Sequence, residues 1–280
     1  MEPGRIVSRR ELFRQGALAA GIAATLDGAS KPVLVGNKQG NFRFLRGIAP
    51  YSSGAIADSG FAVVHVTLSP PPPFRRGFET IDRHLKEQGR PPHALCAIEL
   101  RSPRPFTFTG FNDLNQQYIE LLKERNLLLD GLNPVARTNV APEVRPPSEV
   151  MMYAFSYTAP SAEARPTFVI AGAGELKGER LDARDIVRRG DVSPGGLRAK
   201  ALHVLGLMDE RLGGAGAEWR HVTAVEVYTV HSISALMRDV LLARIGPAAI
   251  HGIRWHFARP PIEEIEFEMD VRGCLHELVL

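Results

Sequence analysis

The apolar positions of this 280-residue chain follow two periodicities that alternate along the sequence. Short β-branched runs are typical of buried strands, and apolar residues three or four apart are typical of helices packed on a core. A first cycle predicts strands over 60–69, 94–100, 136–140 and 150–158 and helices over 76–89 and 113–129. A second cycle predicts strands over 167–172, 221–230, 251–257 and 262–271 and helices over 197–212 and 232–245. Both cycles read strand, helix, strand, helix, strand, strand.

The repeated order predicts a tandem duplication of an α+β unit. The sequence Arg145-Pro146-Pro147 recurs as Arg259-Pro260-Pro261 at the corresponding place in the second cycle. A small polar stretch over 161–165 is typical of a linker. We therefore expect a first domain over 31–160 and a second domain over 166–280.

The first thirty residues differ in character from the rest of the chain. Arg9 and Arg10 precede an uncharged segment over 16–26, and together they resemble a bacterial twin-arginine export signal. The resemblance predicts a signal segment over 1–30 and export to the periplasm. The alternative is an N-terminal amphipathic helix that a cytoplasmic protein retains. In both cases these residues contribute nothing to the predicted fold.

The composition narrows the classes of partner. Thirty-four basic and 31 acidic residues are interspersed and give a formal net charge of +3, which argues against nucleic-acid binding. No apolar run approaches the roughly 20 residues of a spanning helix, so no membrane span is expected. Cys96 and Cys274 lack metal-ligand spacing, and His251 and His256 are five residues apart on a predicted strand, so no metal site is expected. The expected partner is a small molecule or another protein.

Four short patches carry a resemblance to a known family. Residues 49–52 precede the first predicted strand, residues 111–118 open the second helix, and residues 135–140 enter the next strand. In the second half, residues 186–191 precede the first helix. In this order and at these separations, the patches resemble the Rid (YjgF) family of reactive-intermediate deaminases.

The resemblance implies a fold and an activity. Each half would be a chorismate-mutase-like domain, a mixed sheet with two helices packed on one face. Such domains associate into homo-oligomers, usually trimers, with small-molecule sites in the clefts between domains. The implied activity is hydrolysis of an enamine or imine to a ketone with release of ammonia, and it needs no metal or organic cofactor. Other relatives act on cyclic amides or other small carboxylates.

Arg137 is the first candidate site residue. Its guanidinium presents a rigid fork of donors that can hold a substrate carboxylate, and an imino acid held there would expose its electrophilic carbon to water. Tyr51 could orient the substrate through its hydroxyl, and Thr67 stands where the family has a Ser-Gly pair. The alternatives are a surface ion pair for Arg137 and an aromatic lid over the sheet for Tyr51.

A glutamate that activates water is the second expected feature, because active relatives place one in the last strand. In the first half this position falls at Met151 or Met152, which cannot move protons, and in the second half it falls at Glu266. Alternation also puts Arg254 and His256 on one face of their strand. These charged groups form either an acid/base and anion-binding cluster or plain cross-strand charge pairs.

Together these features predict a hydrolase or deaminase that acts on a small carboxylate-bearing imine, enamine or cyclic amide in a cleft between the two halves. The predicted catalytic residues are Arg137, Tyr51, Glu266 and His256, and the predicted substrate-binding residues are Arg137, Thr67 and Arg254. Two alternatives stay open. One is a non-catalytic protein that binds a small ligand or a partner with the same fold, and the other is a chorismate-type or aromatic-acid hydrolase.

Overall fold

The computed structural model describes residues 33–48, 50–178 and 181–280. The predicted signal segment over 1–30 lies outside the described residues, so the predicted export remains a prediction. The described residues all belong to one compact unit, Pro32–Leu280.

Two mixed β-sheets form the centre of this unit. The larger sheet has the order β1-β2-β3-β8-β12-β9-β10. Its strands are β1 (Leu34–Asn37), β2 (Phe42–Leu45), β3 (Gly54–Ala57), β8 (Phe168–Gly174), β12 (Glu268–Gly273), β9 (Ala224–Tyr228) and β10 (Arg254–His256). The smaller sheet has the order β11-β6-β5-β7-β4-β13. Its strands are β11 (Ala258–Arg259), β6 (Ala136–Pro142), β5 (Leu95–Arg101), β7 (Met151–Pro160), β4 (Phe61–Thr67) and β13 (His276–Val279).

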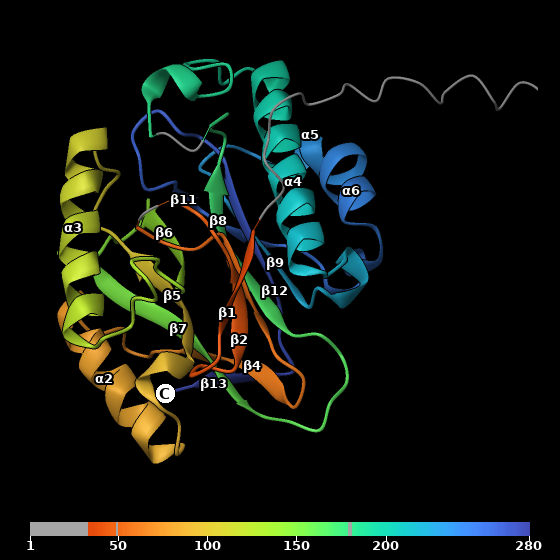
Figure 1. Ribbon diagram of the computed structural model, residues 1–280. Coiled ribbons are helices and arrows are strands. Elements are labelled where there is room, and N and C mark those ends of the chain that lie inside the picture. The colour runs from red at the N-terminus through yellow and green to blue at the C-terminus, as the bar shows by residue number, and fades with distance from the viewer. Residues whose placement is uncertain (1–32, 49, 179–180) are drawn as a thin grey trace, which may run out of the picture. The chain divides into compact units, whose positions relative to one another are not determined.

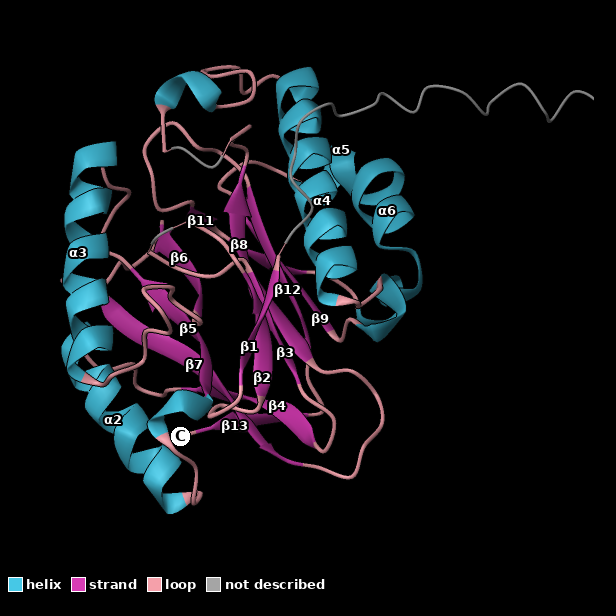
Figure 2. Cartoon of the chain, viewed as in Figure 1, coloured by secondary structure: helices cyan, strands magenta, loops and turns pink. Residues whose placement is uncertain are grey.

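Helices cover the outer faces of both sheets. Figures 1 and 2 show α2 (Phe74–Glu87) and α3 (Phe108–Glu124) on one side of the sheets, and α4 (Pro194–Ala215) with α5 (Ser234–Leu236) and α6 (Ala243–Ile245) on the other. A π-helical turn, η4 (Met237–Leu242), joins α5 to α6. The 3-10 turns are η1 (Pro92–Ala94), η2 (Ala183–Asp185), η3 (Trp219–His221) and η5 (Gly246–His251). Each helical layer forms its own large apolar core with the sheet beneath it.

The inner faces of the two sheets meet through small side chains. Ala97 and Ala136 of the smaller sheet pack against Ala171 of β8. One residue beyond Ala171, the backbone N–H of Gly172 donates a hydrogen bond over 3.0 Å to Thr138 Oγ1, two residues beyond Ala136. Because no large apolar residue separates the sheets here, polar side chains from both of them can meet in the interface.

Each half of the chain supplies four strands in the same order. The first half gives β4-β7-β5-β6 and the second gives β8-β12-β9-β10. The halves also exchange strands, since β3 pairs with β8, β11 pairs with β6 and β13 pairs with β4. The boundary predicted near 161–165 is therefore crossed by strand pairing in both directions. The duplication itself, and the homo-oligomer or trimer that the sequence suggested, stay predictions.

The fold class is confirmed as mixed α+β, and every predicted strand has an observed counterpart. Three elements differ from the prediction. The helix expected over 113–129 spans Phe108–Glu124, five residues earlier at both ends. The helix expected over 232–245 is broken by the π-helical turn. The strand expected over 262–271 begins only at Glu268, because Glu264 has a φ of 69° and the backbone N–H groups of Glu266 and Phe267 donate to the Glu175 carboxylate instead of to a strand.

The described residues contain neither a membrane-spanning helix nor a cluster of metal-binding side chains. None of the helices there is long and apolar enough to cross a membrane. Within the same ranges, no three His, Cys, Asp or Glu side chains gather in a way that would hold a metal ion.

Candidate active site

Arg137 lies on β6 and points toward α3, where aromatic rings surround it. The guanidinium carbon lies 4.7 Å from the ring centroid of Tyr51, 5.3 Å from that of Phe111 and 4.9 Å from that of Tyr118. Its Nη2 donates to Asn115 Oδ1 at 2.5 Å. Arg137 is only 3% exposed, yet no carboxylate pairs with it among the described residues. This is a buried cation in an aromatic setting, and the predicted surface ion pair does not form.

Two nitrogen donors in this setting, together with the Tyr118 hydroxyl, have no partner in the described part of the chain. The two nitrogens are Nη1 of Arg137 and Nδ2 of Asn115, both on buried side chains. A buried donor without an acceptor costs about 1–3 kcal/mol, and more when it is charged. Native proteins keep such groups where a ligand completes them. A carboxylate would satisfy both donors at once.

Tyr51 stands at the opening of the Arg137 site. Its backbone is held in place by its neighbours, because Asn133 Nδ2 donates to the Pro50 carbonyl at 2.6 Å and the Ser52 N–H donates to the Val135 carbonyl at 3.2 Å. The Tyr51 side chain is partly exposed, so it reaches from the buried guanidinium toward the surface. Burial raises the pKa of Tyr51 above 10, against the influence of nearby Arg137. The hydroxyl is therefore a hydrogen-bond donor at neutral pH.

Glu268 is the acidic group of the site. It is the first residue of β12, faces the smaller sheet and is 4% exposed. No ion-pair partner for its carboxyl occurs in the ranges that the structure describes. Burial raises the pKa of Glu268 well above its usual value, and Asp270 and Glu175 raise it further, while Arg211 and Arg137 oppose the shift. A raised pKa favours the protonated carboxyl, which is the form that can act as a general acid.

Gly172 makes room for the Glu268 carboxyl. A Cβ at residue 172 would overlap Glu268 Oε1 and would also come within 3.1 Å of the Thr138 methyl group. The same residue donates to Thr138 Oγ1 across the two sheets. Only glycine therefore allows the acid and the second sheet to approach β8 together. The glycines of the stretch over 172–174 therefore allow close packing, Gly172 against Glu268 and Thr138 and Gly174 against Ile265.

Gly172→Ala is accordingly expected to displace Glu268 and to lower both activity and stability. Forcing a methyl group into a packed interface costs about 1–3 kcal/mol. Gly206→Ala is a matched control, since Gly206 lies within α4 and a Cβ there meets nothing within 4 Å. That change should stabilise the helix by about 0.5–1 kcal/mol. Urea unfolding and a deamination assay on both variants check the prediction, which fails if the two alanines behave alike.

Arg211 approaches the same place from α4. Its Nη1 donates to the backbone carbonyls of Ala171 at 2.9 Å and Gly172 at 3.4 Å. The side chain is half-buried and has no carboxylate partner within the described residues. Burial lowers the pKa of Arg211, while Tyr51 and Glu268 act in the opposite direction. Tyr51, Arg137, Arg211 and Glu268 thus form one electrostatically linked group, which we call the Arg137 site.

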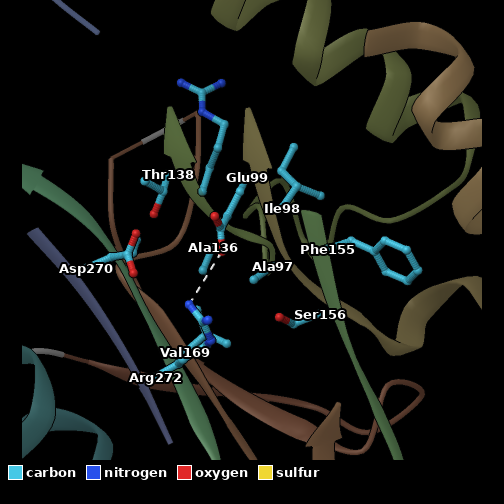
Figure 3. A pocket seen from close by; sticks show the side chains of 12 residues that line it. Ala97, Ile98, Glu99, Ala136, Thr138, Phe155, Ser156, Val169, Asp270 and Arg272 are labelled. Atoms are coloured by element: carbon cyan, nitrogen blue, oxygen red, sulfur yellow. Dashed lines mark ion pairs between the residues drawn. The ribbon is translucent and has the colours of Figure 1, made fainter. Parts of the chain in front are cut away.

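A second polar cluster fills the interface beside the Arg137 site. Tyr228 donates to Asp270 Oδ2 at 2.9 Å, and Arg272 pairs with Glu226 at 3.0 Å and with Glu99 at 3.8 Å. Figure 3 shows Glu99, Asp270 and Arg272 around a cavity of about 10 Å³, with the Arg272–Glu99 pair dashed. That volume suits about one water molecule. Thr138 and Arg137 also line this cavity, so it lies beside the segment of β6 that carries Arg137.

Asp270 gives this cluster a pH-dependent stability. Burial, Glu99 and Glu226 raise the pKa of Asp270 to about 8, whereas an unfolded aspartate titrates near 3.9. Between these values the unfolded chain has lost a proton that the folded protein keeps, so stability falls as pH rises from about 4 to about 8. Asp270→Asn removes this loss, and its stability relative to the wild type should increase by up to about 1.4 kcal/mol per pH unit in that window. Urea unfolding at pH 5 and pH 7.5 measures the difference, and a pH-independent difference would contradict the assignment.

The structure brings together only part of the predicted residue set. The Tyr51 ring packs against the Arg137 guanidinium, while the predicted contact of its hydroxyl with a substrate stays a prediction. Glu266 lies in the segment before β12, where His231 Nε2 is 2.8 Å from its carboxylate. His256 pairs with Glu226 at 2.8 Å, and Arg254 pairs with the same carboxylate at 3.1 Å, so both belong to the charge-paired cluster at the β9–β10 edge.

Thr67 lies far from the Arg137 site along the smaller sheet. Arg137 is aligned with Ile98 on β5, Ile98 with Phe155 on β7, and Phe155 with Val66 on β4, next to Thr67. Three strand spacings separate the two backbones, which is about 14 Å. The Thr67 side chain has no recorded contact with Arg137.

Sequence reasoning did not single out three of the site residues. Glu268 lies within the strand predicted over 262–271 and Arg211 within the helix predicted over 197–212, and neither has a local feature that marks it. Asn115 lay within the patch over 111–118 without a role of its own. The signal that could have found Glu268 is Gly172, since a glycine inside a strand often marks a close approach by another group.

Comparison with known proteins settles the family. Residues 34–278 match the family described as 2-aminomuconate deaminase CnbZ. Over 244 residues the chain is 41% identical to the 2-amino-5-chloromuconate deaminase of Comamonas testosteroni, with 86% of this chain and 96% of that protein covered. The chain belongs to the CnbZ family of 2-aminomuconate deaminases. The prediction of an enzyme of the deaminase class is therefore confirmed.

Two solved structures show weaker likenesses. A chorismatase matches with a TM-score of 0.45 and 13% identity, covering 87% of this chain and 80% of that chain. The cyanuric acid hydrolase of A. caulinodans matches with a TM-score of 0.36 and 11% identity, covering 76% and 66% of the two chains.

The predicted membership of the Rid family is wrong. The match to the CnbZ family extends over nearly the whole described chain, whereas the resemblance to the Rid family rested on four patches of 4–8 residues. Such patches describe local chemistry, such as an arginine entering a strand near an aromatic helix. They do not specify how the strands of the two halves pair, and here the halves exchange strands.

Proposed function

We propose that this chain catalyses the hydrolytic deamination of 2-aminomuconate or a substituted 2-aminomuconate, giving a 2-oxo dicarboxylate and ammonia. The substrate class comes from the family and its Comamonas testosteroni member. The observation that carries the proposal is Glu268, a buried carboxyl with a raised pKa beside two guanidinium groups that have no anionic partner among the described residues.

The substrate is a conjugated enamine that carries carboxylates. Its amino group sits on C2, next to the C1 carboxylate, and C2=C3 is a double bond. Arg137 Nη1 and Asn115 Nδ2 supply the free donors for a carboxylate, and the rings of Tyr51, Phe111 and Tyr118 provide a flat apolar surround for a conjugated chain. Charge-assisted hydrogen bonds from a rigid guanidinium fix both position and orientation.

The first chemical step is transfer of the Glu268 proton to C3. The C2=C3 electron pair forms the new C3–H bond, and the nitrogen lone pair forms C2=N, which leaves an iminium ion and a Glu268 carboxylate. The second step is attack of water on C2. Glu268 accepts the water proton, and the C=N electrons return to nitrogen.

The third step expels ammonia. Glu268 protonates the amino group, the C2–N bond breaks, and the oxygen lone pair forms the C2=O bond while the hydroxyl proton passes back to Glu268. The sum is one substrate and one water giving one 2-oxo dicarboxylate and one ammonia. Glu268 begins and ends protonated, and the cycle therefore needs an acid whose pKa is raised.

The experiment is a deamination assay with the purified full chain. Loss of the conjugated-enamine absorbance and ammonia release are followed together, against a reaction without enzyme. We expect enzyme-dependent loss of substrate with one ammonia released per substrate consumed. Absence of ammonia release above the background reaction would overturn the proposal.

The non-catalytic alternative lacks the support that the sequence alone gave it. That reading rested on Met151 and Met152 at the position expected for a glutamate. Glu268 on β12 supplies the missing acid from the other half of the chain. Self-association remains a separate proposal, and light scattering on the purified chain tests it by giving the molar mass in solution.

A further inference from the structure

Most of the buried cations of the described chain are paired with carboxylates. Lys200 pairs with Glu175 at 2.9 Å, and both side chains are fully buried. Arg272 pairs with Glu226 at 3.0 Å. These two pairs follow the usual rule that a buried charge is matched by an opposite one.

Arg137 departs from this rule, and the half-buried Arg211 beside it also lacks a carboxylate partner within the described residues. Arg137 is bound to a neutral amide, and Arg211 is bound to two backbone carbonyls. Neither guanidinium has an ion-pair partner in the residues that the structure describes. The nearby acid, Glu268, is itself without an ion pair. The site thus holds two guanidinium groups with no carboxylate at ion-pair distance among the described residues, although Glu268 acts on both of them electrostatically and Glu210 acts on Arg211.

The contacts of Arg211 place its charge at the edge of the site. Its Nη1 is fixed on the carbonyls of Ala171 and Gly172, and Gly172 lies against the Glu268 carboxyl. The N–H of Ala171 donates to the Ser53 carbonyl at 3.1 Å, which ties the same stretch of β8 to the segment that carries Tyr51. Two carbonyl acceptors hold one edge of the guanidinium, and its remaining N–H groups have no recorded partner in the described chain.

We propose that Arg211 forms a second carboxylate subsite, so that Arg137 and Arg211 each bind one carboxylate of a dianionic ligand. This inference rests on the proposed function and assigns the residue that selects dicarboxylates. A dianion would neutralise the site, while a monoanion would leave either the buried Arg137 or the half-buried Arg211 unpaired. Because an unpaired charge that is partly removed from water is costly, the site should discriminate against monoanions.

The matched ligand pair is muconate and sorbate, since sorbate is the same conjugated six-carbon chain with a methyl group in place of one carboxylate. Binding of each is measured by calorimetry, which needs no turnover. We expect the wild type to bind muconate roughly ten- to hundredfold more tightly than sorbate. In Arg211→Gln that preference should fall to less than about threefold, mainly through weaker muconate binding.

Two further variants make the test specific. Arg198→Gln removes an exposed arginine from the same helix and should keep the wild-type preference. Arg211→Lys keeps the charge without the planar fork and should show an intermediate preference. Thermal unfolding of each variant verifies that it is folded.

The results separate this inference from the proposed function. If Arg211→Gln weakens muconate and sorbate equally, or if the wild type does not prefer muconate, the second subsite is wrong even when deamination is observed. If the preference for muconate over sorbate depends on Arg211 but no ammonia is released from 2-aminomuconate, the second carboxylate subsite is supported and the proposed reaction is wrong.

Discussion

Arg137→Met is expected to lower kcat/KM for 2-aminomuconate by at least about a hundredfold, since it removes a pair of charge-assisted hydrogen bonds to a carboxylate. The same change should cost less than about 1 kcal/mol of stability. Arg137 is buried without an anionic partner, so methionine, which packs well against Tyr51, Phe111 and Tyr118, relieves an unfavourable desolvation. The Arg137→Met variant would thus lose most of its activity and keep most of its stability.

Lys200→Met provides the opposite case. Lys200 is also fully buried, but it is paired with Glu175, and its removal would leave that carboxylate in the core without its cation. Breaking a buried pair in this way costs about 3–5 kcal/mol. Urea unfolding of the two variants measures the contrast. A large loss of stability in Arg137→Met, comparable with that of Lys200→Met, would show that Arg137 is a structural cation and not a ligand-binding one.

Glu268→Gln is expected to lower kcat by about a thousandfold, because glutamine cannot deliver or accept the protons of the three steps. Muconate affinity should stay near that of the wild type, since the carboxylates are bound by the arginines. The pKa of folded Glu268 is raised, so the wild type loses stability as pH rises above the unfolded value of about 4.3. The glutamine variant avoids that loss and should be more stable than the wild type at pH 7.5, with the gain vanishing near pH 4.

Glu266→Gln is the matched control for this prediction. Glu266 lies two residues before Glu268, carries the same side chain and pairs with His231 instead of facing the Arg137 site. Its replacement should leave kcat within about threefold of the wild type. The assignment of Glu268 fails if the two glutamine variants lose similar amounts of activity, or if Glu266→Gln is the more damaging change.

The elements of the fold could be predicted where the sequence has a clear period. The apolar spacing identified α2 and α4 closely, and β-branched runs identified β4, β6 and β7 within a few residues. Strands of two to four residues, such as β1, β3 and β11, are too short for a period to register. Pairing between the halves could not be read at all, because strand alternation specifies a face and not a neighbour.

The acid predicted from the sequence, Glu266, lies two residues before Glu268, the acid that we propose. Alternation over 262–271 places Glu266 and Glu268 on one face, so the sequence could not choose between them. The two glutamates differ through a tertiary contact. The Glu175 carboxylate accepts hydrogen bonds from the backbone N–H groups of Glu266 and Phe267, so these residues do not pair in the sheet and the strand begins at Glu268. Glu175 in turn is held by Lys200 from α4. No local sequence pattern predicts the contacts of Glu175 with Lys200 and with residues 266–267, because these residues are distant in the chain.

Arg137 and Tyr51 could be predicted because their chemistry is local. An arginine that enters an apolar strand is unusual enough to be noticed, and a tyrosine before a strand can reach over its edge. Arg211 offered no such signal, since arginine is ordinary on a helix. Its role follows only from where α4 packs and from the two carbonyls at the end of the β3–β8 pairing.

The most direct test of Glu268 as the acid and base of deamination is a single-turnover reaction. Wild-type enzyme and Glu268→Gln, each in excess over 2-aminomuconate, are mixed with substrate and quenched, and the ammonia released in the first turnover is measured. The wild type should release one ammonia per substrate, while the variant should bind the substrate and release none over the same interval. Ammonia release by Glu268→Gln at the wild-type rate would contradict the mechanism and move the chemistry to another residue.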